Sequence, residues 1–155
     1  MTAPRSKSTV PDDIQTLYRE VVLDHYRRPR NRQPLARADA SVLLHNPLCG
    51  DQVEVEVRLE GSCICEVSSR ARGCSIVVAA GSVMTELVRG LDAAAVNQLR
   101  ARLERLVKGR ADPSEFPDLD RRIRSFARIA EVPARERCAL LPWEALSEAL
   151  SSSRQ

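Results

Sequence analysis

Apolar and polar residues alternate strictly along residues 52–59, where valine or leucine stands at every second position. This period of two predicts a β-strand with one buried face. Residues 60–62 contain a glycine and form the expected turn, so residues 63–71 should return as the second strand of a hairpin. Residues 29–46 show little periodicity and are expected to form a loop with a short edge strand at 41–44. The pattern therefore predicts a small antiparallel sheet.

Outside this hairpin, apolar residues recur at helical spacing. Asp12 or Asp13 is the expected cap of the first helix, and Pro29 should end it. Gly90 and Gly109 are expected to stop two later helices. The helices expected from this spacing cover residues 12–28, 75–89 and 92–108, a segment around 123–129, and a last helix from about 138 to 150.

Prolines divide the second half of the chain. Pro113 and Pro117 favour a loop over residues 110–120. Pro142 is compatible with the last helix only if that helix starts nearby, because a proline in the first turn lacks an N–H group that would be unpaired anyway. One helix, then the small antiparallel sheet, then several helices predict an α+β fold.

The chain has 155 residues, which suits one domain, and we expect residues 12–155 to form it behind a disordered tail at residues 1–11. Only 3% of the residues are aromatic, so the core should rest on aliphatic side chains. The net charge is +3, and basic residues are interleaved with acidic ones except at 27–30 and 121–124. We interpret these two clusters as solvated helix faces and expect no nucleic-acid partner.

The sequence shows no signal peptide and no apolar run of membrane length, so we expect a cytoplasmic protein without a membrane partner. Thiols stay reduced in that compartment, and the five cysteines form an odd count. Metal or sulfur chemistry is therefore favoured over disulfides.

Three cysteines and one aspartate are the candidate metal ligands: Cys49, Asp51, Cys74 and Cys138. A glycine separates Cys49 from Asp51, so both side chains can point to one side. Cys74 and Cys138 are expected next to helix starts, where the positive end of a helix lowers a thiol pKa. Three thiolates and a carboxylate suit Zn²⁺ or the edge of an iron–sulfur cluster. The alternative, that these cysteines are small buried apolar residues, accounts poorly for a Cys-Gly-Asp sequence.

Several motifs in order carry a family resemblance that spans nearly all of residues 17–150. They are LYREVVLDHY at 17–26, HNPLCGD at 45–51, GCSI at 73–76 with SVMTE at 82–86, and RCALLPW at 137–143. With these motifs the chain resembles the NifU/IscU scaffold family, and specifically its SufU branch. The long interval between Cys74 and Cys138, 64 positions, resembles the SufU type with its additional segment. Arg137 stands where the IscU type has a histidine before its final cysteine.

The resemblance implies a small antiparallel sheet packed by helices, with a metal site at one end. It implies that the four candidate ligands bind Zn²⁺. It also implies that Cys49 accepts sulfur, as a persulfide, from a SufS-type cysteine desulfurase that carries pyridoxal phosphate. The sulfur would pass to a downstream Suf scaffold or to apo iron–sulfur proteins. Arg135 matches a basic residue associated with this activity, and Arg137 is a neighbouring candidate.

Three functional classes follow for the chain. The first is a zinc-dependent sulfurtransferase, which the resemblance favours. The second is a scaffold on which a [2Fe–2S] cluster is assembled and transferred, and the third is a zinc-stabilised interaction module without turnover. The remaining candidates are interpreted as structural. Cys63 and Cys65 are expected on one face of a strand, and His25 is expected to be a packed or hydrogen-bonded helix residue. His45 is expected to have a structural role before the turn at 46–49, and Trp143 is expected in the core or at an interface.

Overall fold

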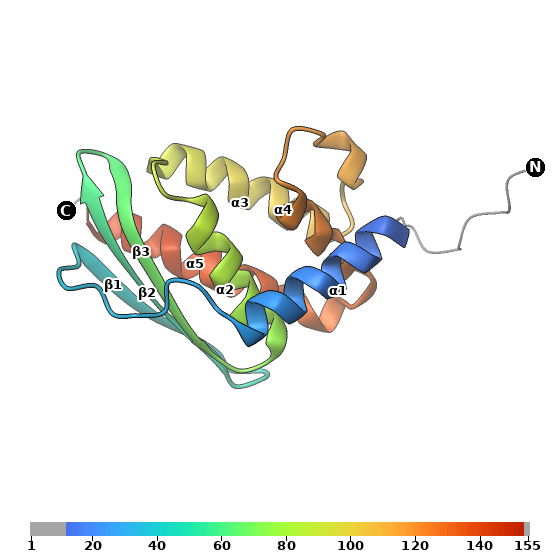
Figure 1. Ribbon diagram of the computed structural model, residues 1–155, viewed down its shortest axis with the longest axis horizontal. Coiled ribbons are helices and arrows are strands. Elements are labelled where there is room, and N and C mark those ends of the chain that lie inside the picture. The colour runs from blue at the N-terminus through green and yellow to red at the C-terminus, as the bar shows by residue number, and fades with distance from the viewer. Residues whose placement is uncertain (1–11, 154–155) are drawn as a thin grey trace, which may run out of the picture.

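The computed structural model describes residues 12–153, and the expected tail at residues 1–11 lies outside them. Figure 1 shows a three-stranded sheet at one side of the molecule with helices packed against it, which confirms the α+β class. The helices are α1 (Asp12–Arg27), α2 (Ser75–Leu87), α3 (Ala93–Val107), α4 (Arg121–Ser125) and α5 (Glu136–Ser152), and the strands are β1 (Ala40–Asn46), β2 (Asp51–Glu60) and β3 (Cys63–Arg72). Short 3₁₀ segments lie at Pro113–Glu115, Phe126–Glu131 and Pro133–Arg135.

The sheet is antiparallel, with the strand order β1-β2-β3. In the central strand β2, Val53, Val55 and Val57 are fully buried in the core, as the alternating pattern predicts. Helix α5 contacts β1 and β2, and α2 contacts β3. The edge strand β1 is longer than expected, because it pairs with β2 along its whole length, from Ala40 opposite Val57 to Asn46 opposite Asp51.

The core joins α2 and α5 to the sheet through close packing. Gly81 of α2 lies so near β3 that a side-chain carbon at this position would overlap the hydroxyl of Ser69. Trp143 is buried in α5, which confirms its interpretation as a core residue, and Phe126 is buried beside the aliphatic side chains. The core is therefore mainly aliphatic, as the composition predicts.

The last helix begins earlier than expected. Helix α5 starts at Glu136, so Pro142 lies inside the helix and not in its first turn, and the expected position was wrong. A proline there offers no N–H group to the carbonyl of Cys138, four residues before it. Cys138 was expected where the helix begins, but it is the third residue of α5 and lies inside its first turn. The expected loop at residues 110–120 contains a capped 3₁₀ turn at Pro113–Glu115.

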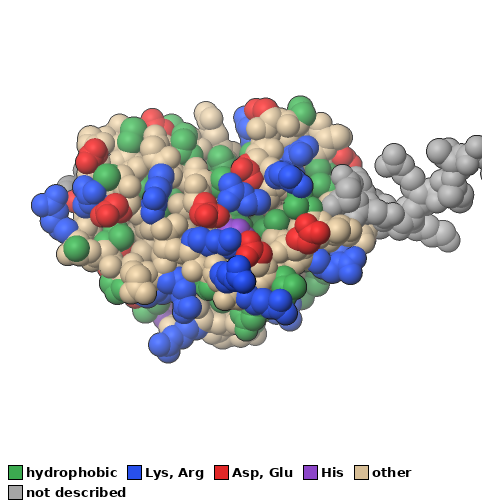
Figure 2. All heavy atoms as spheres, viewed as in Figure 1, with side chains coloured by type: hydrophobic (Ala, Val, Ile, Leu, Met, Phe, Trp, Pro, Cys, Tyr) green, Lys and Arg blue, Asp and Glu red, His purple; other side chains and the backbone are tan. Residues whose placement is uncertain are grey.

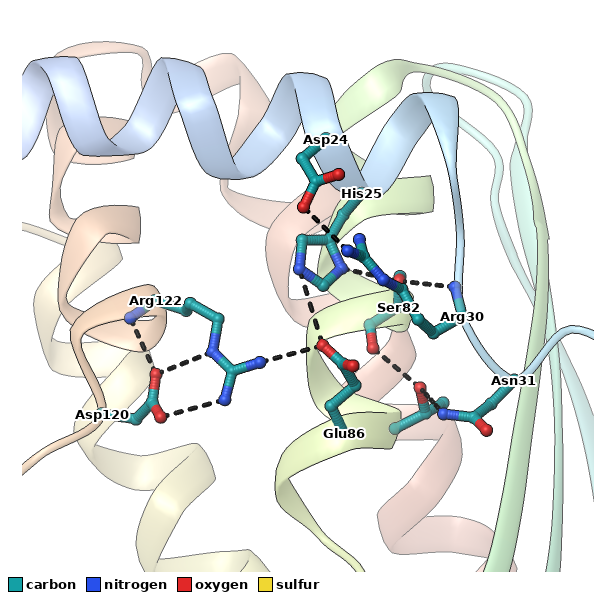
Figure 3. A network of polar contacts seen from close by, with 9 residues as sticks. Asp24, His25, Arg30, Asn31, Ser82, Glu86, Asp120 and Arg122 are labelled. Carbon is teal, nitrogen blue, oxygen red and sulfur yellow. Dashed lines mark hydrogen bonds and ion pairs between the residues drawn. The ribbon is translucent and has the colours of Figure 1, made fainter.

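One arginine of each basic cluster is paired with acidic side chains. Arg30 lies 2.8 Å from Asp24, and Arg122 lies 3.0 Å from Asp120 and 2.9 Å from Glu86. Figure 3 shows Arg122 between these two acidic side chains. Figure 2 shows basic and acidic side chains interspersed over this face. Within the described residues, no helix has both the length and the apolar character that crossing a bilayer requires.

Candidate functional site

The turn between β1 and β2 exposes Cys49 to solvent. The buried Asn46 shapes this turn, because its backbone carbonyl accepts hydrogen bonds from the N–H groups of Cys49 (3.3 Å) and Gly50 (2.9 Å). Its side-chain oxygen also accepts from the N–H of Leu48 at 3.2 Å. Gly50 has a φ of +75°, which glycine adopts without strain. The chain then enters β2 at the buried Asp51, so an exposed thiol and a buried carboxylate face one site.

Cys74 and Cys138 reach the same site from two helices. Cys74 is the N-terminal cap residue of α2, as expected, and its N–H donates a 3.0 Å hydrogen bond to Asp51 Oδ1. Gly73, with a φ of +144°, lies so close to Asp51 that a side-chain carbon would overlap the carboxylate. Cys138 is fully buried in the first turn of α5. Both helix starts therefore point thiols at Asp51.

The distances within this cluster suit a single metal ion. The ligand atoms of Cys49, Asp51 and Cys138 all lie within 4.8 Å of one another. The sulfurs of Cys49 and Cys138 are 4.0 Å apart, and Cys74 Sγ lies 3.7 Å from Asp51 Oδ2. Tetrahedral Zn–S bonds of about 2.3 Å place two sulfurs about 3.8 Å apart, so these separations fit. Cys74 lies outside the mutually close group, beside Asp51 and Cys138.

Burial and hydrogen bonding set the protonation of the cluster. Burial raises the pKa of the Cys138 thiol well above its ordinary value, and hydrogen bonds with Asp51 and Cys74 raise it further. Burial also acts to raise the pKa of Asp51, but hydrogen bonds from Cys138, Cys49 and Cys74 outweigh it and lower that pKa. The expected lowering of the Cys138 pKa by its helix start was wrong, because burial dominates.

Arg135 is the arginine that lies beside the thiols. Its exposed guanidinium hydrogen-bonds with Cys138, and this contact raises the pKa of Arg135, with a further contribution from the charge of Cys74. Arg137 instead lies 3.5 Å from Glu144 and is half exposed. Of the two candidates from the sequence, Arg135 has the position for a role in sulfur transfer, and that role remains a prediction.

Three residues that the sequence analysis left unassigned also border or shape the site. Asn46 and Gly73 fix the turn and the Asp51 contact, and both lie inside the quoted motifs. Tyr18 of α1 is the third, and it lies inside the quoted motif at 17–26. Burial raises the pKa of Tyr18 to about 12, with Cys74 and Cys138 contributing to the rise and Arg128 and Arg135 opposing it. Tyr18 packs edge-on against Phe126, with ring centroids 5.9 Å apart, so α1 forms one wall near the thiols.

The other two cysteines lie elsewhere on the sheet. Cys63 and Cys65 are half-buried near the far end of β3, roughly 30 Å along the strand from Gly73. Arg58 donates a 2.9 Å hydrogen bond to Cys65 Sγ, and Cys63 forms an isolated bridge with Asp92. These contacts agree with a structural interpretation of both residues.

The two histidines are not part of the thiol cluster. His25 is buried between α1 and α2, with Nδ1 2.7 Å from the hydroxyl of Ser82 and Nε2 3.7 Å from Glu86 (Figure 3). This confirms the interpretation of His25 as a hydrogen-bonded helix residue. His45 is exposed on β1, next to Asn46.

The fold and the site together define a small α+β protein with a thiol-rich site suited to a soft metal ion or to sulfur. Residues 17–113 match the family described as the NifU-like N terminal domain. The chain belongs to this family, in which the related SufU and IscU proteins are named for sulfur transfer and iron–sulfur cluster assembly.

Two relatives match this chain over most of their length. The zinc-dependent sulfurtransferase SufU of Bacillus subtilis (strain 168) is 30% identical over 142 residues, which cover 90% of this chain and 92% of SufU. The iron–sulfur cluster assembly scaffold protein IscU of Streptococcus pyogenes serotype M1 is 32% identical over 140 residues, which cover 90% of this chain and 86% of IscU. The resemblance to the NifU/IscU family and its SufU branch is confirmed.

Solved structures share the fold. A putative iron–sulfur cluster assembly scaffold protein for the SUF system, from the thermophile Fervidobacterium islandicum AW-1, has a TM-score of 0.76 and 26% identity, covering 88% of this chain and 98% of its own. A nitrogen-fixing NifU-like protein from Brucella abortus has a TM-score of 0.80, with 91% and 96% of the two chains covered. At 22% identity, the second similarity supports the fold alone.

Proposed function

We propose that this chain is a zinc-binding sulfur acceptor in cytoplasmic iron–sulfur cluster assembly, and that Cys49 receives persulfide sulfur from a SufS-type cysteine desulfurase. The observation that carries the proposal is the position of Cys49, an exposed thiol whose sulfur lies within 4.8 Å of the ligand atoms of Asp51 and Cys138. Exposure lets the thiol reach the persulfide of a partner, and clustering lets it serve as a metal ligand. The similarity to SufU over nearly the whole of both chains supports this function.

Cys49, Asp51, Cys74 and Cys138 are the residues that would hold Zn²⁺. When bound, the ion would stabilise the thiolate forms of these cysteines, which burial alone disfavours at Cys138. Asp51 is a hard oxygen ligand among soft sulfur ligands, so it is the ligand most easily displaced.

In the transfer step, the Cys49 sulfur attacks the terminal sulfur of the desulfurase persulfide. A bond forms between Cys49 Sγ and that sulfur, the sulfur–sulfur bond of the partner breaks, and the desulfurase cysteine leaves as a thiolate. Arg135 supplies positive charge next to Cys74 and Cys138, which favours thiolates at the site. The pyridoxal phosphate belongs to the desulfurase, and the sulfur passes on to a Suf scaffold or to apo iron–sulfur proteins.

Incubation with a SufS-type desulfurase and L-cysteine, followed by peptide mass mapping, tests the proposal. We expect the added sulfur on Cys49. Elemental analysis should find about one zinc ion per chain, lost when Cys49, Cys74 or Cys138 is replaced by alanine. Cys63→Ala and Cys65→Ala are matched controls that should keep the metal. Full zinc retention in two of the three ligand variants would contradict the zinc site, and a wild-type chain without any persulfide would favour the interaction module.

A scaffold for a [2Fe–2S] cluster is the second candidate function. The three thiols and the carboxylate can also hold this cargo, and the similarity to IscU favours it. Reconstitution of a cluster and its transfer to an apo-protein, with no persulfide on Cys49, would support the scaffold over the sulfur acceptor.

A further inference from the structure

The contact between the sulfurs of Cys49 and Cys138, at 4.0 Å, gives a persulfide on Cys49 a second thiol to react with. We propose that, in the metal-free protein, Cys138 resolves the Cys49 persulfide by forming a Cys49–Cys138 disulfide and releasing sulfide. This inference rests on the proposed sulfur-acceptor function, and it assigns Cys138 a reaction of its own in addition to metal binding.

The two thiols differ in burial in the way that such a displacement requires. Cys138 is fully buried and Cys49 is exposed. Sulfur added to Cys49 therefore extends toward solvent, while Cys138 faces the inner sulfur from the protein side. Exchange at sulfur proceeds by attack of one sulfur and departure of another. Attack by Cys138 from the buried side, with departure of the added sulfur into water, would place the attacking and leaving sulfurs on opposite sides of Cys49 Sγ.

The geometry selects Cys138 over the other thiols. Cys74 Sγ lies 3.7 Å from Asp51 Oδ2, outside the group in which all ligand atoms are close to Cys49. Cys63 lies at the far end of β3. Among the residues that the structure describes, Cys138 is the thiol in contact with Cys49.

The turn that carries Cys49 can supply the remaining approach. A disulfide needs a sulfur–sulfur separation of about 2.05 Å, so the pair must close by roughly 2 Å. Gly50 has no atom within 4 Å of the position of a side-chain carbon, and Leu48 is 90% exposed. Neither residue is therefore packed against the core, which leaves the turn room to shift.

The step balances without an external oxidant. A bond forms between Cys138 Sγ and Cys49 Sγ, and the bond between Cys49 Sγ and the added sulfur breaks. The added sulfur takes the electron pair and leaves as sulfide, together with the thiol proton of Cys138. The Cys138 sulfur is oxidised from a thiol to a disulfide sulfur, the added sulfur is reduced to sulfide, and the Cys49 sulfur keeps the oxidation state that it has in the persulfide.

Metal occupancy would decide the fate of the sulfur. When Cys138 serves as a metal ligand, its sulfur electron pair is engaged and is not available for attack. The persulfide on Cys49 should then persist until an acceptor protein takes it. The metal-loaded chain would pass on sulfane sulfur, and the metal-free chain would release sulfide.

The test loads Cys49 of the chelator-treated chain in two separate ways, with the desulfurase and L-cysteine or with inorganic polysulfide. After removal of excess donor, released sulfide and the intact and peptide masses are measured. We expect wild type to release about one sulfide per chain and to form the Cys49–Cys138 disulfide. Cys138→Ser should keep the persulfide on Cys49. Cys63→Ser is the matched control, since it also replaces a partly buried thiol but lies at the far end of β3, and it should still release sulfide.

Each result separates this inference from the proposed function. Persistent persulfide on metal-free wild type overturns the inference and leaves the sulfur-acceptor function in place. Transfer of the added sulfur to Cys138 without sulfide release also overturns it. If polysulfide loads Cys49 and the disulfide forms but the desulfurase loads nothing, the inference holds and the proposed function is wrong. Cys138→Ala, which keeps an apolar side chain in the core, should behave as Cys138→Ser, and circular dichroism confirms that both variants fold.

Discussion

Replacing Gly73 by alanine tests how the backbone positions the ligands. Gly73 has a φ of +144°, which residues with a side chain rarely adopt, and an alanine methyl group would overlap the Asp51 carboxylate. Asp51 is buried and accepts the 3.0 Å hydrogen bond from the Cys74 N–H. The substitution must therefore shift the backbone or push Asp51 away from Cys74.

The expected cost of Gly73→Ala is large. Backbone strain of this kind costs about 1–3 kcal/mol. Loss of a buried hydrogen bond to a charged group costs about 1.5–3 kcal/mol more. The sum of these two costs is a substantial part of the free energy of unfolding of a domain, which is roughly 5–15 kcal/mol. The midpoint of thermal unfolding should fall by roughly 5–20 °C for a chain of this size.

Gly90→Ala is the matched control for this prediction. Gly90 also has a positive φ, +84°, but a side-chain carbon there would meet open space. Its cost should be the backbone strain alone, about 1–3 kcal/mol, with the zinc content unchanged. Thermal unfolding of the metal-free proteins and elemental analysis of the metal-loaded ones measure both quantities. Equal midpoints and equal zinc content in the two variants would refute the role assigned to the Gly73–Asp51 contact.

Three further predictions concern the site and its support. Asp51→Ala should keep zinc but change the rate of sulfur transfer, because water can replace this weaker ligand. Elemental analysis measures the zinc and a transfer assay measures the rate. A variant that is metal-free and unfolded would contradict this prediction. Arg135→Ala should slow transfer several-fold while Arg137→Ala should not, since Arg135 contacts the thiols, and equal rates would contradict this. Burial lowers the pKa of His25, and the charge of Arg30 lowers it further. The unfolded chain therefore binds a proton at His25 more readily than the folded chain does. The free energy of unfolding should therefore be retained above about pH 6.5 and should decrease as the pH drops below this value. Denaturant titrations at several pH values should show a smaller decrease for His25→Gln than for the wild type.

Local patterns predicted the parts of the molecule that local forces determine. The alternation at residues 52–59 gives β2 because a period of two places every second side chain on the core face. The helical spacing at residues 92–108 gives α3, and Asp92 caps it by accepting a hydrogen bond from the N–H of Ala95, which depends only on neighbouring residues. The sequence also predicted that Cys49 and Asp51 face one site, because the single glycine between them allows both side chains to point to one side.

The features that the sequence did not predict depend on contacts between distant segments. The pKa of Cys138 rises because α5 packs under the sheet and buries the thiol, which outweighs the local helix start. Tyr18 borders the thiols only because α1 lies against the 3₁₀ segment that contains Phe126. Pro142 is tolerated inside α5, where tertiary packing offsets the missing hydrogen bond. The choice between Arg135 and Arg137 likewise required the path of the chain into α5.

The wide spacing of the ligands has a consequence for the synthesis of the protein. Cys49 and Cys138 are 89 residues apart, so Cys49 leaves the ribosome long before its nearest thiol partner exists. Helix α5 supplies Cys138 and also covers β1 and β2. The folding of α5 therefore completes the core and brings the buried Cys138 thiol to the exposed Cys49 in a single event. A nascent chain without α5 has an unfinished core and a Cys49 that lacks its Cys138 neighbour, so the thiol cluster can form only after the last helix has been translated.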